Sequence, residues 1–365
     1  MSKAQIKKEN LEKIVVAMSG GVDSSTVAAM LSQENKEIIG ITLQLYDHGA
    51  IINKKGACCA GQDIYDAAMV ASKLNIPHYV LDYESRFKQS VIDDFVDSYL
   101  KGETPLPCVK CNQSVKFNDL INFAKELGAQ KLVTGHYVQK IHTKQGPEMH
   151  KGLDPKKDQS YFLFATTKEQ LEFLDFPLGR LSKEETRQYA RKFGLINSDK
   201  ADSQDICFVP DGSYAALIKK LRPDAIKTGV IMHIDGYALG EHDGIVNYTI
   251  GQRKGIGVSF SEPLYVVKLD PDKNIVYVGP ESALEASTFK IKDVNWLDHK
   301  PPVEGLEVTV KIRSTHNGAE AKIYPIDNTS IFVKLLSLER AITPGQACVI
   351  YNDTRVLGGG WITKE

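Results

Sequence analysis

The chain has 365 residues, of which 42% are hydrophobic and 25% are charged, values typical of a soluble globular protein with two or three domains. No apolar run approaches the roughly 20 residues that a membrane span needs, and residues 1–10 lack the apolar core of a secretion signal. We therefore expect a cytoplasmic protein without membrane contacts, and we also expect it to be a monomer. Its net charge of −1 neither indicates nor excludes a nucleic-acid partner.

The first predicted elements are an apolar strand over 14–18, a glycine turn with the sequence SGGVDS, and a helix over 25–31. Such a turn directs free backbone N–H groups and the positive end of the helix dipole toward an anion. Asp23 can hold the Mg²⁺ that accompanies a nucleoside triphosphate. The turn lacks the Lys of a Walker A loop and the spacing of a dinucleotide-binding turn. The competing interpretation is an ordinary strand-to-helix turn.

Strands and helices then alternate, which predicts a parallel sheet with right-handed crossovers in an α/β domain. The predicted strands cover 38–45, 78–81 and 131–138; the predicted helices cover 63–74, 87–100 and 117–127, with a loop over 102–111. Ligands of such sheets bind at the carboxyl ends of the strands. Leu43 and the Thr134–His136 segment, near two such ends, are expected beside a nucleoside.

After residue 138 the sequence predicts first a capped helix and then a series of short strands. Ser182 and Glu185 form a capping box that predicts a helix ending at Phe193. Short β segments from Pro263 onward predict a small β-barrel. We predict a catalytic domain over 1–212, a central connecting α+β domain over 213–281 and a C-terminal β-barrel over 282–365, with 173–200 packing on the central domain.

The cysteines allow several interpretations. Cys108 and Cys111 form a C-x-x-C pair, and Cys207 lies far away in the sequence. A zinc site would need a second spaced pair, and most iron–sulfur clusters need four thiolates. Persulfide chemistry needs only two thiols that can meet, one with a lowered pKa. Lys110 and Lys116, near Cys111, would favour a thiolate, although inert buried thiols also remain possible on these residues alone.

Other residues carry weaker signals. Cys348 lies within an apolar strand and is predicted to be a core residue. Cys58 and Cys59 receive no role. Five lysines between positions 140 and 160, together with Arg253–Lys254, could contact phosphates or form an ordinary solvated surface.

Eight segments in order along the whole chain resemble the tRNA-specific 2-thiouridylase family. They are AMSGGVDS at 17–24, PCVKCNQSVKF at 107–117, TGHY at 134–137, KDQSYFL at 157–163, PLGRLSKEETR at 177–187, DSQDICFV at 202–209, YTIGQRKGIG at 248–257 and TPGQACVIY at 343–351. The resemblance implies an N-type ATP pyrophosphatase domain (adenine-nucleotide alpha-hydrolase-like), a small central domain and a β-barrel. It implies ATP-dependent transfer of sulfur to C2 of the wobble uridine of tRNA.

The resemblance also implies roles for individual residues. Cys111 corresponds to the nucleophile, and Cys207 to the persulfide carrier that forms a transient disulfide with it. Cys108 stands where some relatives carry Asp, so it is expected to be dispensable for catalysis. The implied ATP-binding residues are Ala17, Met18, Ser19, Gly20, Gly21, Val22, Asp23, Ser24, Leu43 and Gly135. The implied tRNA-binding residues are Leu106, Pro107, Cys108, His136, Lys157, Asp158, Gln159, Arg313, Ser314 and Gln346.

The resemblance implies ATP with Mg²⁺ as co-substrate, no resident metal and no tightly bound cofactor. The implied partners are the anticodon arm of tRNA and a protein that donates sulfur. Three alternatives compete with this interpretation: an iron–sulfur-dependent tRNA thiolase, another ATP pyrophosphatase-type synthetase such as an amidating enzyme of the GMP or NAD type, and a non-catalytic tRNA-binding module.

Overall fold

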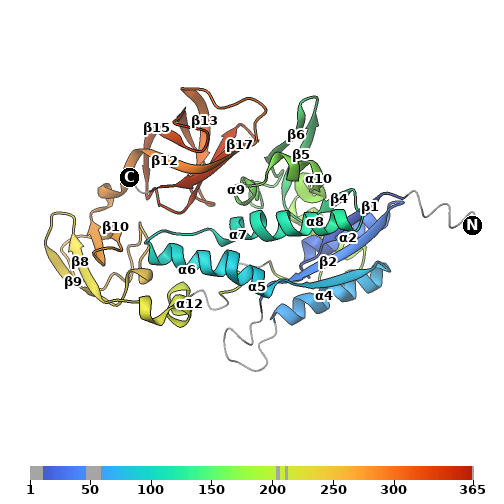
Figure 1. Cartoon of the computed structure of the whole chain (residues 1–365), viewed down its shortest axis with the longest axis horizontal. Coiled ribbons are helices and arrows are strands. Elements are labelled where there is room, and N and C mark those ends of the chain that lie inside the picture. Colours follow the sequence, from blue (N-terminus) through green and yellow to red (C-terminus); the bar gives the residue numbers. More distant parts are fainter. Residues whose placement is uncertain (1–10, 47–58, 203–205, 210–212, 364–365) are drawn as a thin grey trace, which may run out of the picture. The chain divides into compact units, whose positions relative to one another are not determined.

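A computed structural model describes residues 11–46, 59–202, 206–209 and 213–363 (Figure 1). The chain divides into two compact units. One comprises residues 1–90, 109–204 and 354–356, and the other comprises residues 91–108, 205–353 and 357–365. Within the described ranges, no helix combines the length and the apolar character needed to cross a membrane.

The elements up to residue 192 are β1 (Lys13–Ala17), α2 (Val22–Ser32), β2 (Glu37–Gln44), α4 (Cys59–Leu74), β3 (His78–Asp82), α5 (Glu84–Phe87), η1 (Lys88–Ile92), α6 (Asp93–Leu100), α7 (Pro107–Lys110), η2 (Cys111–Asp119), α8 (Leu120–Glu126), β4 (Lys131–Val133), β5 (Val138–Thr143), β6 (Gly146–Lys151), α9 (Ser160–Leu163), α10 (Lys168–Phe173), β7 (Leu174–Asp175), η3 (Pro177–Arg180) and α11 (Lys183–Lys192).

The later elements are α12 (Tyr214–Leu221), η4 (Pro223–Ala225), β8 (Gly229–His233), β9 (Ala238–His242), η5 (Ile245–Asn247), β10 (Tyr265–Asp270), β11 (Ile275–Gly279), η6 (Glu281–Leu284), β12 (Glu285–Trp296), β13 (Leu306–Lys311), β14 (Ala319–Pro325), β15 (Ile331–Arg340), β16 (Ala347–Asn352) and β17 (Arg355–Ile362).

The first unit contains the predicted parallel sheet, with strand order β3-β2-β1-β4-β7 and every pairing parallel. Alternate residues of β1, Ile14 and Val16, pack with apolar residues of α2 and α4 in one buried cluster. Residues 173–200 contribute Leu178, Ala190 and Leu195 to the same cluster. Their predicted contact with the central domain stays a prediction. The α/β prediction for this part of the chain is confirmed.

The single strand predicted over 131–138 is wrong. β4 ends at Val133, which pairs with Asp175 of β7, and the Thr134 N–H makes the last bond to that strand, at the Asp175 carbonyl. Val138 instead begins β5, which forms an antiparallel hairpin with β6. Both halves carry apolar residues, but Gly135 between them is a residue that often interrupts a strand.

The loop predicted over 102–111 is also too long. Residues 107–110 form the short helix α7, and Cys111 opens η2, a nine-residue π-helix that leads into α8. The Leu120 N–H donates to the Val115 carbonyl, five residues earlier, as the π pattern requires. π-helical turns occur frequently at functional sites. This π-helix determines which way the residues after Cys111 point.

The second unit contains two β structures. A four-stranded sheet has the order β10-β11-β8-β9, and β10 and β11 form an antiparallel hairpin. Six later strands, in the order β12-β15-β14-β13-β16-β17, close into a barrel through β12–β17 pairing. Cys348 lies fully buried in the barrel core, as predicted, and burial raises the pKa of its thiol. The C-terminal β-barrel is therefore confirmed.

Helix α11 begins where its capping box predicts. The Ser182 side chain accepts from the Glu185 N–H at 3.2 Å, and the Glu185 carboxylate accepts from the Ser182 N–H at 2.7 Å. These reciprocal bonds satisfy two backbone donors that the first helical turn would leave open. The cap also places the next residue, Lys183, at the start of the helix.

We expect Ser182→Ala to lower the free energy of unfolding by about 1 kcal/mol, because it removes the acceptor for the Glu185 N–H. Chemical denaturation followed by circular dichroism measures this loss. Ser182→Thr, which keeps the hydroxyl, should retain most of the stability. Equal stability of Ser182→Ala and the wild type would contradict the capping role.

Candidate functional site

The SGGVDS turn connects β1 to α2 in a geometry that requires glycine. Gly20 has a φ of +73°, and a Cβ there would lie 2.1 Å from the Asp63 carbonyl oxygen, so no larger residue fits. Gly21 is the N-cap of α2, with no side chain to cap the first turn. The N-terminus of this 11-residue helix therefore lacks a side-chain acceptor of its own, as a helix that binds an anion would.

The two serines of the turn stabilise one another. The Ser19 N–H donates to Ser24 Oγ at 3.1 Å, and the two hydroxyl oxygens lie 3.3 Å apart. From outside the turn, Asn197 Nδ2 donates to the Gly20 carbonyl at 2.9 Å and to Ser25 Oγ at 2.8 Å. The turn is thus held in one shape by partners within the first unit.

A pocket of about 230 Å³ opens beside this turn. Of the predicted ATP-binding residues, those that line it are Ala17, Met18, Ser19, Asp23, Ser24, Leu43 and Gly135. Two residues predicted to contact tRNA, His136 and Gln159, line the same pocket. Gly135 lies against the first turn of α2, where a Cβ would be 2.8 Å from the Ser24 nitrogen. Polar groups at one wall and apolar side chains elsewhere suit a nucleotide.

The Asp23 carboxylate is held by a lysine that the sequence analysis did not assign. Lys183 Nζ lies 2.7 Å from Asp23 Oδ1 and 2.8 Å from Oδ2. The Tyr137 hydroxyl donates to Asp23 Oδ1 at 2.8 Å and lies 3.0 Å from Thr186 Oγ1. Burial, followed by the charge of Asp23, raises the pKa of Tyr137, so its hydroxyl stays protonated and able to donate.

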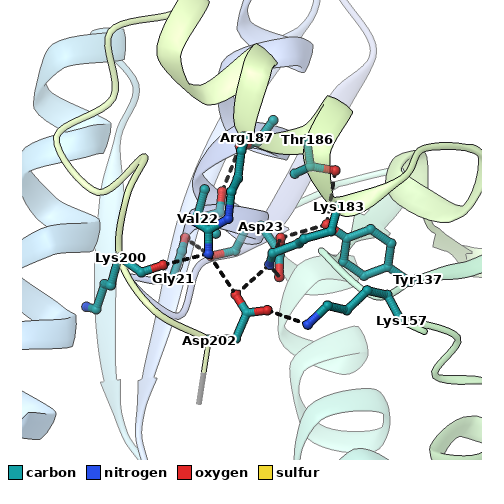
Figure 2. Close-up of polar contacts among 12 residues, drawn as sticks. Gly21, Val22, Asp23, Tyr137, Lys157, Lys183, Thr186, Arg187, Lys200 and Asp202 are labelled. Atoms are coloured by element: carbon teal, nitrogen blue, oxygen red, sulfur yellow. Dashed lines mark hydrogen bonds and ion pairs between the residues drawn. The ribbon is translucent and has the colours of Figure 1, made fainter. Parts of the chain in front are cut away.

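Asp202 joins this lysine to two other cations (Figure 2). Its carboxylate lies 2.7 Å from Lys183 Nζ, 2.7 Å from Lys157 Nζ and 3.3 Å from Arg187 Nη2. Partial burial works in the opposite direction, but hydrogen bonds from Lys157 and Lys183 hold the pKa of Asp202 below its usual range. Lys157, predicted to contact tRNA, is therefore paired with a carboxylate here.

A second ion cluster supports the turn from its other side. Lys200 Nζ lies 2.7 Å from Asp63 Oδ1 and 2.5 Å from Asp66 Oδ2, and it donates to the Gly20 carbonyl at 3.3 Å. Lys183 and Lys200 are 160 and 180 residues from the turn residues that they contact. Local sequence patterns do not reveal such pairs, although Lys183 belongs to one of the eight segments that carry the family resemblance.

His136 lies in the pocket wall with its ring packed edge-on against Phe117 and Phe176. Its Nδ1 is 2.8 Å from Thr134 Oγ1. Burial, reinforced by the positive charge of Lys116, lowers the pKa of His136 to about 3. The imidazole is therefore neutral at physiological pH and offers hydrogen bonds rather than a charge.

The cysteines of the C-x-x-C pair differ in exposure. Cys111 is buried at the start of η2 in the first unit, whereas Cys108 is exposed and belongs to the second unit. Cys207 is exposed and also belongs to the second unit. The pairing of Cys111 with Cys207 therefore stays a prediction. Cys58 lies outside the described residues, and Cys59 opens α4.

The other predicted tRNA contacts have structural partners within their own units. Asp158 Oδ1 accepts from the Gly152 and Ser160 N–H groups, each at 3.0 Å. Arg313 Nη1 donates to the Arg340 carbonyl, and Gln346 Nε2 donates to the Thr104 carbonyl. Ser314 is exposed, Leu106 is half-buried and Pro107 is buried. The roles of these residues toward tRNA stay predictions.

Several pocket residues were not predicted to bind a ligand. They are Ile41, Leu45, Lys116, Phe117, Leu120 and Leu132. Thr134, expected beside a nucleoside, does line the pocket. Ile41 and Leu45 flank Leu43, so the β2 strand pattern could have indicated them. Lys116 and Phe117 come from η2, whose π geometry has no recognisable sequence signature. Among the described residues, no group of three or more His, Cys, Asp or Glu side chains could hold a metal ion.

Comparison with known proteins identifies the family. The model described as tRNA methyl transferase HUP domain matches residues 12–211, the tRNA methyl transferase PRC-barrel domain matches 216–280, and the aminomethyltransferase beta-barrel domain matches 286–362. The "tRNA-specific 2-thiouridylase MnmA" of Rickettsia bellii (strain OSU 85-389) is 67% identical over 353 residues, covering 96% of each chain. The chain belongs to the tRNA-specific 2-thiouridylase family.

A second relative and one solved structure are also similar to this thiouridylase family member. The protein of the same name from Rickettsia felis (strain ATCC VR-1525 / URRWXCal2) is 67% identical over 96% of this chain and 97% of its own. A solved structure titled "Crystal structure of a 4-thiouridine synthetase - RNA complex with bound ATP" is 17% identical with a TM-score of 0.37, covering 59% of this chain and 51% of that one. This structural similarity is too low to support an argument.

The neutral His136 predicts a pH dependence of stability in this thiouridylase family member. The unfolded histidine binds a proton near pH 6.5, whereas folded His136 does so only near pH 3. Between these values only the unfolded state gains the proton, so stability falls as the pH is lowered, by at most about 1.4 kcal/mol per pH unit. We expect His136→Gln to make the slope of unfolding free energy against pH shallower between pH 6 and pH 4.

Denaturant titrations at a series of pH values measure that slope. A constant loss of stability from altered packing would shift the whole curve without changing the slope. An unchanged slope in His136→Gln would show that His136 is not held neutral by the fold.

Proposed function

We propose that the chain is an ATP-dependent tRNA-uridine 2-sulfurtransferase that replaces O2 of the wobble uridine, position 34, with sulfur. The observation that carries the proposal is the 67% identity, over 96% of both chains, to a protein named tRNA-specific 2-thiouridylase. The pocket beside the SGGVDS turn supports it, because activation of a uridine oxygen needs a nucleotide site with anion-binding groups.

In the first half-reaction, O2 of uridine attacks the α-phosphorus of ATP and pyrophosphate leaves. The N-terminus of α2 and the hydroxyls of Ser19 and Ser24 would stabilise the charge on the leaving pyrophosphate. Asp23 suits a magnesium ion held mainly by phosphates, because it is the one carboxylate among the pocket-lining residues. Mg²⁺, when bound, would neutralise phosphate charge, and Asp23 would have to be shared between that ion and Lys183.

In the second half-reaction, the terminal sulfur of a Cys207 persulfide attacks C2 of the adenylated base, and AMP leaves. Cys111 thiolate then attacks the Cys207 sulfur of the resulting disulfide, which releases 2-thiouridine and leaves a Cys111–Cys207 disulfide. An external dithiol supplies the two electrons that restore both thiols. The base must leave the anticodon stack to reach these groups.

We further propose that a separate protein delivers the sulfur, and that the enzyme acts in the cytoplasm as a monomer. We keep the division at 1–212, 213–281 and 282–365 as the proposed functional domains. Contacts to the anticodon arm are assigned to His136, Lys157, Asp158, Gln159, Arg313, Ser314 and Gln346, and contacts to the target base to Leu106, Pro107 and Cys108.

The test is mass analysis of tRNA nucleosides after incubation of the purified protein with tRNA, ATP–Mg²⁺, sulfide and a dithiol. We expect 2-thiouridine that depends on ATP, together with AMP and pyrophosphate. A methylated nucleoside, 4-thiouridine or no change would contradict the proposal. Visible absorbance of the active protein, lost together with activity on iron chelation, would instead favour an iron–sulfur thiolase.

The two thiols are expected to act as one unit. Cys111→Ser and Cys207→Ser should each abolish thiolation, and the double variant should be no worse than either single one. Cys108→Ser is the matched control within the C-x-x-C pair and should keep substantial activity. Active Cys111→Ser with inactive Cys108→Ser would mean that the other cysteine of the pair is the nucleophile.

The Asp23 carboxylate is expected to serve chemistry rather than tRNA docking. Asp23→Ala should slow pyrophosphate release by about 100-fold or more and leave tRNA affinity within a few fold of the wild type. Asp199→Ala, which removes an exposed carboxylate paired with Arg191, is the control and should leave both quantities unchanged. Normal pyrophosphate release in Asp23→Ala would refute the assignment of this turn.

A further inference from the structure

Nearly all cationic side chains around the SGGVDS turn form ion pairs with carboxylates. Lys183 pairs with Asp23 and Asp202, and Lys157 and Arg187 pair with Asp202 (Figure 2). Lys200 pairs with Asp63 and Asp66. Each of these positive charges is therefore at least partly neutralised by the protein itself. A nucleotide with several negative charges would benefit most from a cation that has no such partner.

Lys116 is such a cation. It is half-buried and lines the pocket together with Asp23, Ser24 and His136. Within the described part of the chain, its ammonium makes no ion pair or hydrogen bond. Its positive charge acts on groups in the pocket wall: after burial, it is the second cause that lowers the pKa of His136. Lys116 is also the one Lys or Arg among the residues that line this pocket.

The π-helix relates Lys116 to the predicted nucleophile. In this helix type, hydrogen bonds join residues five apart, so Lys116 lies one turn after Cys111 on η2. Both residues belong to the first unit, as do all residues that line the pocket. The pocket cation and the thiol are therefore carried by adjacent turns of one rigid element.

We propose that Lys116 binds the α-phosphate of ATP and of the adenylated uridine. The assignment rests on the proposed function, in which the α-phosphorus is bonded to O2 of the base whose C2 must be reached by sulfur. Of the three phosphates, the α-phosphate must therefore lie nearest the thiols. The β- and γ-phosphates leave as pyrophosphate and are assigned to the turn and the N-terminus of α2.

A cation at the α-phosphate would act in both half-reactions. It would stabilise the negative charge that builds on the α-phosphate oxygens as uridine O2 attacks and pyrophosphate departs. It would then stabilise AMP as the leaving group when sulfur attacks C2, because AMP carries away the electron pair of the C2–O2 bond. Lys116 gives up no proton in either step; it contributes charge and a hydrogen bond.

The test measures binding of three probes to the full-length protein by calorimetry: adenosine, AMP and inorganic pyrophosphate. AMP carries the α-phosphate alone, so the ratio of AMP to adenosine affinity reports this one site. In Lys116→Met we expect AMP affinity to fall about tenfold or more, while the affinities for adenosine and pyrophosphate stay within about threefold of the wild type. Lys116→Arg should restore part of the AMP affinity.

Lys125→Met is the matched control, because Lys125 is an exposed lysine on α8, which continues directly from η2. It should bind all three probes as the wild type does. A parallel loss of adenosine and AMP affinity in Lys116→Met would indicate a disturbed pocket and would overturn the proposal. Loss of pyrophosphate affinity with normal AMP affinity would place Lys116 at the leaving phosphates and would overturn it as well.

These measurements need neither tRNA nor sulfur, so they separate the two proposals. If the wild type forms 2-thiouridine but Lys116→Met binds AMP normally, only the role of Lys116 fails. If Lys116→Met selectively loses AMP affinity but the wild type forms no 2-thiouridine, only the proposed function fails. If Lys116→Met binds AMP normally, another group must neutralise the α-phosphate. Lys116→Met should then also release pyrophosphate at the wild-type rate.

Discussion

The ion pair between Lys183 and Asp23 is the interaction on which the nucleotide site most depends. It joins the first turn of α2 to the first turn of α11, and it places a fixed positive charge behind a carboxylate that faces the pocket. Without this neutralisation, the Asp23 carboxylate would repel a polyphosphate. The same lysine also contacts Asp202, so a single ammonium connects the turn to Asp202. Removing one member would leave partly buried charges unpaired, which is more costly than losing an exposed pair.

Much of the first unit could be predicted because its signals are local. The apolar run of β1, the glycines of the turn and the capping box at Ser182 each act within a few residues, and the structure agrees with all three. The alternation of strands and helices indicated the parallel sheet for the same reason. Leu43 and Gly135 were expected at the pocket because strand ends in such sheets share one edge, and both line it.

The missed features depend on contacts that no local pattern encodes. Lys183 reaches Asp23 across 160 residues of chain. The chain turns out of the sheet after Val133 because Gly135 packs against the backbone of α2, a contact between distant segments. The short helix α7 replaced part of an expected loop, and the π-helix that follows it from Cys111 carries Lys116 in the pocket wall. The cysteine roles came from family resemblance, since the spacing of the thiols alone left zinc, iron–sulfur and persulfide chemistry open.

Closure of the six-stranded barrel restricts how another molecule can bind it. Pairing of β12 with β17 satisfies the backbone groups that would otherwise line an open edge. Between β12 and β17, a partner therefore finds no open edge to which it could add a strand, and the side chains and connecting loops of the barrel wall are what it can contact. Binding by strand addition, which serves many extended peptides, needs an open strand edge of the kind that this pairing closes. The same pairing also protects the domain from edge-to-edge association with copies of itself.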